Sequence, residues 1–280
     1  MTESSRLQPS QRRFIAAADA PPVSEPGIAT RYMRSQNTLI AWSDVARASS
    51  AIHQDSPDEI FVILPDVSAV LSGHGAAVEA PARSICILPA GATTIELTAP
   101  GSVIRVFSPV PEALAGLAIN GDDYAAPRAG VGPIGAPLVR IGEPSIRVYA
   151  IDAFKAAAGR RPPTFQTATM NVMWIEQDGP TSRAKLNPHS HDDFEESALV
   201  IAGAYRQHLR TPWAADAAEW QDDEHVTCTP ATLILVPPTV IHTTEALGPG
   251  RHVMLNLFAP ARSDHIKSGM VLNAQEYSSA

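Results

Sequence analysis

The chain has 280 residues, of which 45% are hydrophobic and 18% charged, and this composition is typical of a folded globular protein rather than a disordered one. The formal net charge of −8 argues against a surface for nucleic acid or an anionic membrane, because both need clustered Lys and Arg. The polar stretch 1–20 lacks the apolar centre of a signal peptide, and no run is long enough to span a bilayer. We therefore expect a cytoplasmic protein that binds neither nucleic acid nor membrane.

The first half of the chain has the pattern of an all-β fold. Residues 1–28 form a loose, polar leader, and short runs rich in Ile and Val follow it, bounded by Pro, Gly or Asp. Such runs predict short strands. Residues 108–120 have helical spacing with Pro near the start, which predicts a short helix. The strand-like runs are Glu59–Leu64, Ser84–Leu88 and Ser102–Phe107.

A stretch rich in Gly, Pro and Ala separates the two halves, and we place the interdomain linker within it at 126–140. Short apolar runs then resume at regular spacing, with almost no helical pattern between them. Regular short strands of this kind indicate a β-sandwich or barrel. The runs of the second half are Ile146–Ile151, Met170–Ile175, Ser197–Ala202, Thr232–Val236 and His252–Phe258.

The two halves share a weak internal repeat. Aligning Pro89 with Pro237 superimposes the apolar runs before them, at an offset of 148. Glu59 and the run after it align with Glu196 and its run at an offset of 137, so the second half holds an insertion of 11 residues. The acidic stretch 212–224 fits that insertion, and its two Trp are interpreted either as an apolar lid or as ordinary loop packing. Two copies of one β unit are the predicted architecture.

The strongest chemical signal is a cluster of histidine and carboxylate side chains. His189 and His191 are two residues apart, so on a strand their side chains point to the same face. A carboxylate follows closely at Glu196, and His242 comes after the apolar run of 232–236 and a Pro-Pro turn. Imidazole nitrogens together with one carboxylate suit Mn, Fe, Co, Ni, Cu or Zn.

This pattern resembles the first motif of the cupin superfamily, which is His-x-His, three or four residues, Glu, six residues and Gly. His189, His191, Glu196 and Gly203 fit it with the four-residue spacing. Glu195 is the rival ligand, but only Glu196 has the six-residue gap to Gly203.

The second cupin motif centres on Pro-x-Gly-x-x-His. Pro237 and His242 fit it, while Thr239 replaces the usual Gly and Ala246 stands where an Asn is often seen. Both departures concern turn and packing positions rather than metal ligands. The resemblance therefore implies that His189, His191, Glu196 and His242 bind one divalent transition metal, which could be Fe, Mn, Ni or Zn.

The resemblance also implies the fold: all-β, with two tandem cupin barrels of the double-stranded β-helix or jelly-roll type and few short helices. We place the N-terminal barrel at 29–125, the metal-binding barrel at 141–268 and a C-terminal tail at 269–280. A homodimer is expected, because related two-barrel cupins tend to pair.

The N-terminal half lacks a complete ligand set. By the repeat, Thr94 matches His242, and Asp66 stands where the Gly of the first motif should be. His53, Asp55 and Glu59 are interpreted as remnants of that motif. We therefore expect the first barrel to be structural and free of metal.

Three His and one Glu fill about four of six octahedral positions, which leaves room for a substrate or O₂. The prediction is a metal-dependent enzyme on a small oxygenated organic substrate, a dioxygenase ahead of a lyase or isomerase. Tyr205 and Gln207 share one face of a strand after Gly203 and, with Asn256 on the last strand, are the candidate substrate contacts. The alternatives are a non-catalytic small-molecule-binding protein and a metal that only stabilises the barrel.

Overall fold

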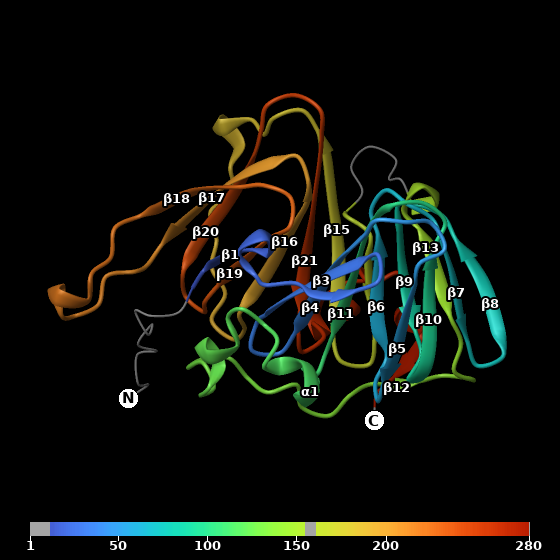
Figure 1. Cartoon of the computed structure of the whole chain (residues 1–280). Helices are drawn as coiled ribbons and strands as arrows, with labels where there is room; N and C mark the ends of the chain where they lie inside the picture. The colour runs from blue at the N-terminus through green and yellow to red at the C-terminus, as the bar shows by residue number, and fades with distance from the viewer. Residues whose placement is uncertain (1–11, 155–160, 280) are drawn as a thin grey trace.

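The computed structural model describes residues 12–154 and 161–279. Over these residues the chain forms two tandem cupin barrels, each built from a large sheet that faces a smaller one (Figure 1). The predicted all-β class is confirmed. The described helices are short: α1 (Glu112–Ala115), α2 (Ser263–Lys267) and the 3₁₀ turns η1 (Ala17–Asp19), η2 (Gly121–Tyr124), η3 (Ile151–Phe154), η4 (Arg183–Lys185), η5 (Ala217–Glu219) and η6 (Ala274–Glu276).

In the N-terminal barrel the described strands form a seven-stranded sheet, ordered β13-β9-β6-β11-β4-β3-β2, and a four-stranded sheet, ordered β5-β10-β7-β8. All pairings are antiparallel, and alternate residues point into the barrel. The strands are β2 (Val23–Glu25), β3 (Ile28–Arg34), β4 (Leu39–Val45), β5 (Ala51–Ser56), β6 (Ile60–Leu64), β7 (Ala69–Gly73), β8 (Ala76–Ala80), β9 (Ser84–Leu88), β10 (Gly91–Leu97), β11 (Gly101–Phe107) and β13 (Arg147–Ala150).

In the C-terminal barrel the described strands form a six-stranded sheet, ordered β1-β19-β16-β21-β15-β14, and a three-stranded sheet, ordered β18-β17-β20. The strands are β1 (Phe14–Ala16), β14 (Thr164–Gln166), β15 (Asn171–Asp178), β16 (Glu196–Ala202), β17 (Ala204–Arg210), β18 (Glu224–Cys228), β19 (Thr232–Val236), β20 (Ile241–Leu247) and β21 (Arg251–Phe258).

The two barrels exchange strands. β1, from the segment predicted to be a loose leader, pairs with β19 of the C-terminal barrel, whereas β13, placed by sequence in the C-terminal barrel, pairs with β9 of the N-terminal one. Within the predicted linker and tail, β12 (Val139–Arg140) pairs with β22 (Tyr277–Ser278). Strands of two to four residues carry too little periodicity to predict their partners. The two barrels remain in tandem, but each includes one short strand from the part of the sequence assigned elsewhere.

A shared core joins the large sheets. On β6, Ile60, Val62 and Leu64 face the interior of the N-terminal barrel, while Phe61 and Ile63 face a second core that also contains residues of β15, β16, β19 and β21. Strands buried on both faces appear in the sequence as continuous apolar runs. Burying one such side chain contributes roughly 1.5–3 kcal/mol, so this shared core fixes one barrel against the other.

The internal repeat is visible in the segments that follow β11 and β21. Asn120 accepts a hydrogen bond from the amide of Arg34 (2.9 Å) and donates to the carbonyl of the same residue (2.7 Å). Asn273 makes the same pair of bonds with Gln166, at 2.8 and 2.9 Å. Two equal anchors at equivalent places support the predicted duplication.

The insertion 212–224 forms the connection of the β17–β18 hairpin, which projects away from the body of the molecule (Figure 1). Trp213 and Trp220 stack on each other there, with ring centroids 4.5 Å apart and planes 9° apart. Trp213 is 77% exposed, so of the two interpretations of this pair, packing within the loop fits better than an apolar lid. No helix in the described residues is long and apolar enough to cross a membrane.

Candidate metal centre

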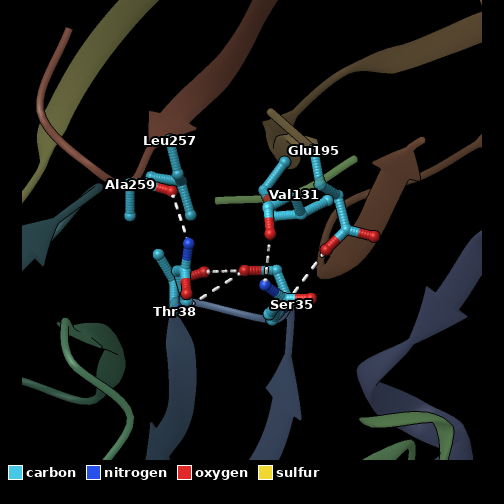
Figure 2. A pocket seen from close by; sticks show the side chains of 9 residues that line it. Ser35, Thr38, Val131, Glu195, Leu257 and Ala259 are labelled. Carbon is cyan, nitrogen blue, oxygen red and sulfur yellow. Dashed lines mark hydrogen bonds between the residues drawn. The ribbon is translucent and has the colours of Figure 1, made fainter. Parts of the chain in front are cut away.

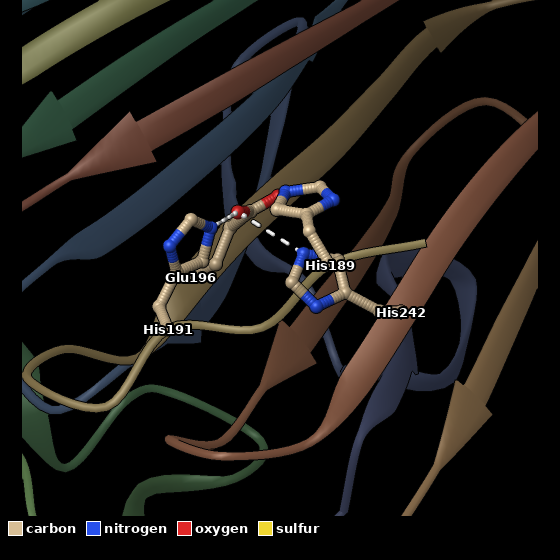
Figure 3. Close-up of side chains that lie close together, drawn as sticks. All are labelled: His189, His191, Glu196 and His242. Carbon is tan, nitrogen blue, oxygen red and sulfur yellow. Dashed lines mark ion pairs between the residues drawn. The ribbon is translucent and has the colours of Figure 1, made fainter. Parts of the chain in front are cut away.

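Four side chains converge in the C-terminal barrel: His189, His191, Glu196 and His242 (Figure 3). One ligand atom from each lies within 4.8 Å of the others. Glu196 opens β16 and His242 lies on β20, while the other two histidines come from the irregular segment before β16. The sequence grouped these residues on motif spacing, and the fold brings them together.

Backbone hydrogen bonds hold the two motifs side by side. The amide of His189 donates to the carbonyl of His242 (3.0 Å), and the amide of His242 donates back to His189 (2.8 Å). The predicted strand for the first motif is thus a single bridge, which still places His189 opposite His242. Nearby, Thr239 has φ of 70°, so the turn keeps the left-handed conformation that Gly usually supplies.

The ring tautomers of two histidines suit a metal. Nδ1 of His189 lies 3.0 Å from the carbonyl of Asn187, and Nδ1 of His242 lies 3.0 Å from that of Val240. A carbonyl oxygen only accepts, so each Nδ1 carries the proton and each Nε2 presents a lone pair. Nε2 of His242 is buried and makes no well-aligned hydrogen bond, although Oε2 of Glu196 lies 3.4 Å away. A cation at the centre of the cluster would satisfy it.

Glu196 is the anionic member of the cluster. Its Oε2 lies 3.2 Å from Nε2 of His191 and 3.4 Å from Nε2 of His242, and its Oε1 accepts a hydrogen bond from Asn256 (3.0 Å). Burial acts to raise the pKa of Glu196, but the two histidines outweigh it and lower the pKa to about 2. Three imidazole nitrogens and one carboxylate form a donor set for a divalent transition metal.

The three predicted substrate contacts lie at different depths in the barrel. Asn256 touches the ligand set directly through Glu196. Gln207 faces the interior and pairs with Thr244, the next inward-facing residue after His242 on β20, from which it accepts a hydrogen bond. Tyr205 lies two residues further along β17, where it pairs with Ala246. Its side chain is buried, and its hydroxyl has no hydrogen-bond partner. Of these three residues, only Asn256 therefore contacts the four-residue cluster.

The aromatic wall beside the cluster was missed by the sequence analysis. The ring of Phe194 lies 4.4 Å from that of His191 and 5.7 Å from Phe258. The guanidinium of Arg262 lies 4.3 Å from the centre of the Phe194 ring. Phe194 stands inside the first motif, between His191 and Glu196, and that position was an available signal.

Glu195 points to the opposite face of its strand. It is buried at the junction of the barrels (Figure 2), pairs with Arg128 and accepts hydrogen bonds from the hydroxyl of Tyr124 (3.1 and 3.0 Å) and the amide of Gln36 (3.1 Å). Its role is therefore to tie the interdomain segment and the β3–β4 turn to the strand that carries Glu196.

The strand registers locate the counterpart of this cluster in the N-terminal barrel. Glu196 pairs with Val236, next to Pro237, and Ile60 pairs with Leu88, next to Pro89. Ile60 therefore occupies the place of Glu196, one residue from the Glu59 of the sequence alignment. The inward-facing pair Gln54 and Thr93 likewise takes the place of the bridged pair His189 and His242, and Ser56 that of His191.

The predicted remnants of the first motif lie elsewhere. His53 and Asp55 are exposed, and Nδ1 of His53 lies 3.2 Å from the hydroxyl of Thr94 on the outer face of the small sheet. Glu59 pairs with Arg147 and accepts a hydrogen bond from Tyr277 (2.7 Å). A slip of one residue moves every side chain to the opposite face of a strand, and the sequence alignment contained such a slip.

Comparison with known proteins supports the fold. No protein-family profile and no curated protein sequence matches the chain. Among solved structures, a point mutant of Bacillus subtilis oxalate decarboxylase is similar, with a TM-score of 0.59 and 11% identity, over 91% of this chain and 79% of the decarboxylase chain. AerE from Microcystis aeruginosa has a TM-score of 0.56 and 9% identity, over 85% of this chain and 95% of its own.

A further oxalate decarboxylase structure from Bacillus subtilis, with a TM-score of 0.55 and 11% identity, is described for its Mn(II) centres; the match covers 91% of this chain and 79% of that one. At these identities the likeness concerns the fold alone. The chain thus has the cupin fold, and the chemistry of its site is argued from its own residues.

Proposed function

We propose that the chain is a metal-dependent cupin enzyme that acts on a small oxygenated organic substrate. One observation carries the proposal: three imidazoles and a carboxylate converge within 4.8 Å inside a barrel, and the buried Nε2 of His242 makes no well-aligned hydrogen bond. In this proposal the N-terminal barrel holds no metal, because Gln54, Ser56, Ile60 and Thr93 stand at the four ligand places.

A divalent ion held by these four residues would supply Lewis acidity or one-electron chemistry, with about two open coordination positions. The protein groups around it have separate tasks. Asn256 orients Glu196 through its 3.0 Å hydrogen bond, and the aromatic pair Phe194 and Phe258 keeps water from one side of the cluster. Gln207 and Thr244, on the inward rung next to His242, offer hydrogen bonds to substrate oxygens.

A dioxygenase-type reaction is the first candidate, since two open positions accommodate both O₂ and a chelating substrate. A lyase reaction such as a decarboxylation is the second, and the shared fold with a decarboxylase favours including it. A non-catalytic, small-molecule-binding protein is the alternative from another class.

Elemental analysis of tag-free wild-type protein beside His242→Ala tests the site. We expect about one Fe, Mn, Ni or Zn per chain in the wild type and almost none in the variant. His225→Ala, which changes an exposed histidine on β18, is the matched control and should keep the metal. Wild-type protein that stays metal-free after reconstitution contradicts the proposal.

The metal-loaded protein is then screened with small 2-oxo acids, dicarboxylates and phenols for oxygen uptake and for CO₂ release. Oxygen uptake selects the dioxygenase, and CO₂ release without oxygen uptake selects the lyase. Saturable binding that never yields product selects the binding protein.

A further inference from the structure

A buried arginine lies inside the N-terminal barrel. Arg105 is on β11 between Val103 and Phe107, whose side chains belong to the barrel core, and it is only 6% exposed. Its Nη1 donates to Oε1 of Gln54 (2.7 Å) and its Nη2 to the hydroxyl of Ser43 (3.4 Å). Its Nε has no hydrogen-bond partner. The side chain of Tyr32 is also hydrogen-bonded to Arg105. None of these three partners is a carboxylate, so the positive charge is not balanced by its immediate contacts.

The other buried arginines of the described chain are paired. Arg128 forms an ion pair with Glu195, and Arg147 pairs with Glu59 and Glu276. Arg105 forms no ion pair with a carboxylate of the described residues, and Glu25 acts on it only at longer range. Burial lowers the pKa of Arg105, which the neighbouring Tyr32 offsets only in part. Buried charges are normally paired with an opposite charge, so this position favours the binding of an anion.

The position of Arg105 corresponds to a functional position in the other barrel. Arg105 pairs with Val62 on β6, two residues after Ile60. Asn256 pairs with Ala198 on β16, two residues after Glu196. Arg105 therefore occupies the position of Asn256, which hydrogen-bonds to Glu196 in the C-terminal barrel. Where the C-terminal barrel has a cluster suited to a cation, the N-terminal barrel has a positive charge.

The groups around Arg105 suit an anion. Gln54, Ser56 and Thr93, at the three histidine places, carry neutral amide and hydroxyl groups that form hydrogen bonds. Gln54 and Thr93 also line a hollow of about 430 Å³ at the small sheet, together with Gly73 and residues of the outer face that include His53, Asp55 and Thr94. Gln54 therefore contacts both the guanidinium and a hollow at the surface of the barrel.

We propose that the N-terminal barrel binds a small organic carboxylate through the guanidinium of Arg105, assisted by Gln54 and Thr93. A guanidinium presents parallel N–H groups that match the two oxygens of a carboxylate. A monoanion balances the single buried charge, whereas a phosphate dianion would leave an excess negative charge in the barrel. This site is separate from the proposed metal centre and does not depend on it.

Titration calorimetry with sodium acetate and sodium propionate tests the proposal, in the His242→Ala background so that the C-terminal centre contributes no metal-bound carboxylate. Sodium chloride at equal ionic strength is the blank, and inorganic phosphate is the competing probe. We expect one carboxylate per chain and at least a tenfold loss of affinity in Arg105→Gln. Arg206→Gln, which removes the same charge from β17 of the other barrel, should bind as the parent does.

Gln54→Leu is the second variant, needed if Arg105→Gln does not fold, and it should weaken carboxylate binding several-fold with an unchanged circular dichroism spectrum. Because a buried unpaired charge is lost, Arg105→Gln should also melt no lower than its parent when no anion is present. No heat with either carboxylate, equal affinity in the folded Arg105 and Gln54 variants, or binding of phosphate alone would overturn the proposal.

Discussion

The two barrels share an arrangement of strands and differ in the side chains at the centre of each interior. Glu196 and Asn256 in the C-terminal barrel correspond to Ile60 and Arg105 in the N-terminal barrel, at the same registers of equivalent strands. The C-terminal barrel collects a carboxylate and three imidazoles, whereas the N-terminal barrel collects an isolated guanidinium among neutral groups. Equivalent interior positions of the two barrels therefore carry opposite charges.

The largest expected effect is the loss of the metal centre. His191→Ala removes one of three nitrogen donors, so we expect metal content to fall from about one per chain to near zero and turnover to be abolished. Elemental analysis and the activity screen measure both. His53→Ala, in the N-terminal barrel, should change neither, and retained turnover in metal-free His191→Ala would disprove a catalytic metal.

Removing the metal with a chelator should destabilise the protein through its C-terminal barrel. A ligand present at 1,000 times its Kd stabilises the folded state by about 4 kcal/mol, so stripping the metal should lower the free energy of unfolding by about that amount. Urea denaturation of loaded and chelated wild type measures it. The His242→Ala protein is the control, and a similar loss in that variant would mean that the chelator acts elsewhere.

Breaking one ion pair near each barrel tests whether the Arg128 pair supports the metal centre as well as stability. Arg128→Met leaves Glu195 without its partner and Arg147→Met does the same to Glu59, and each change should cost about 3–5 kcal/mol of stability. Only Arg128→Met should also weaken metal binding, because Glu195 precedes the ligand Glu196 in the chain. Denaturation and metal titration of both variants check this, and equal metal affinities would limit the Arg128 pair to stability.

A smaller change is expected from the support of the carboxylate ligand. Asn256→Ala removes the hydrogen bond to Oε1 of Glu196, and loss of such an outer contact typically weakens metal affinity about 10–100-fold. Competition with a chelator of known affinity measures the change. Asn120→Ala, which removes an anchor of the N-terminal barrel whose side chain is hydrogen-bonded to the backbone of Arg34, is the control for stability loss and should leave the metal affinity of the folded protein intact.

The smallest effect is expected on the projecting hairpin. Trp213 is 77% exposed, and substitutions at exposed positions usually change stability by less than about 0.5 kcal/mol. Trp213→Ser should therefore leave unfolding and metal content within that range. A fall of several kcal/mol would show that the Trp pair packs against the body of the protein.

Motif spacing and period-two patterns were sufficient for the fold class and the four metal-binding candidates. His189 and His191 were grouped by their spacing, and Glu196 and His242 by their distances to a glycine and a proline turn. Gly203 fits that scheme physically, because its φ is 74° and an added Cβ would lie 2.5 Å from Cδ2 of His252. Local geometry of this kind is encoded by neighbouring residues.

Tertiary structure decided what the local pattern left open. The run Ile60–Leu64 is apolar throughout, so it has no period that tells which face points inward, and the repeat alignment slipped by one residue there. The exchange of β1 and β13 depends on partner strands that are distant in the sequence. Arg105 is recognisable in the sequence as a charged residue within an apolar run. Its lack of a carboxylate partner depends on three-dimensional contacts, which the sequence determines only through the complete fold.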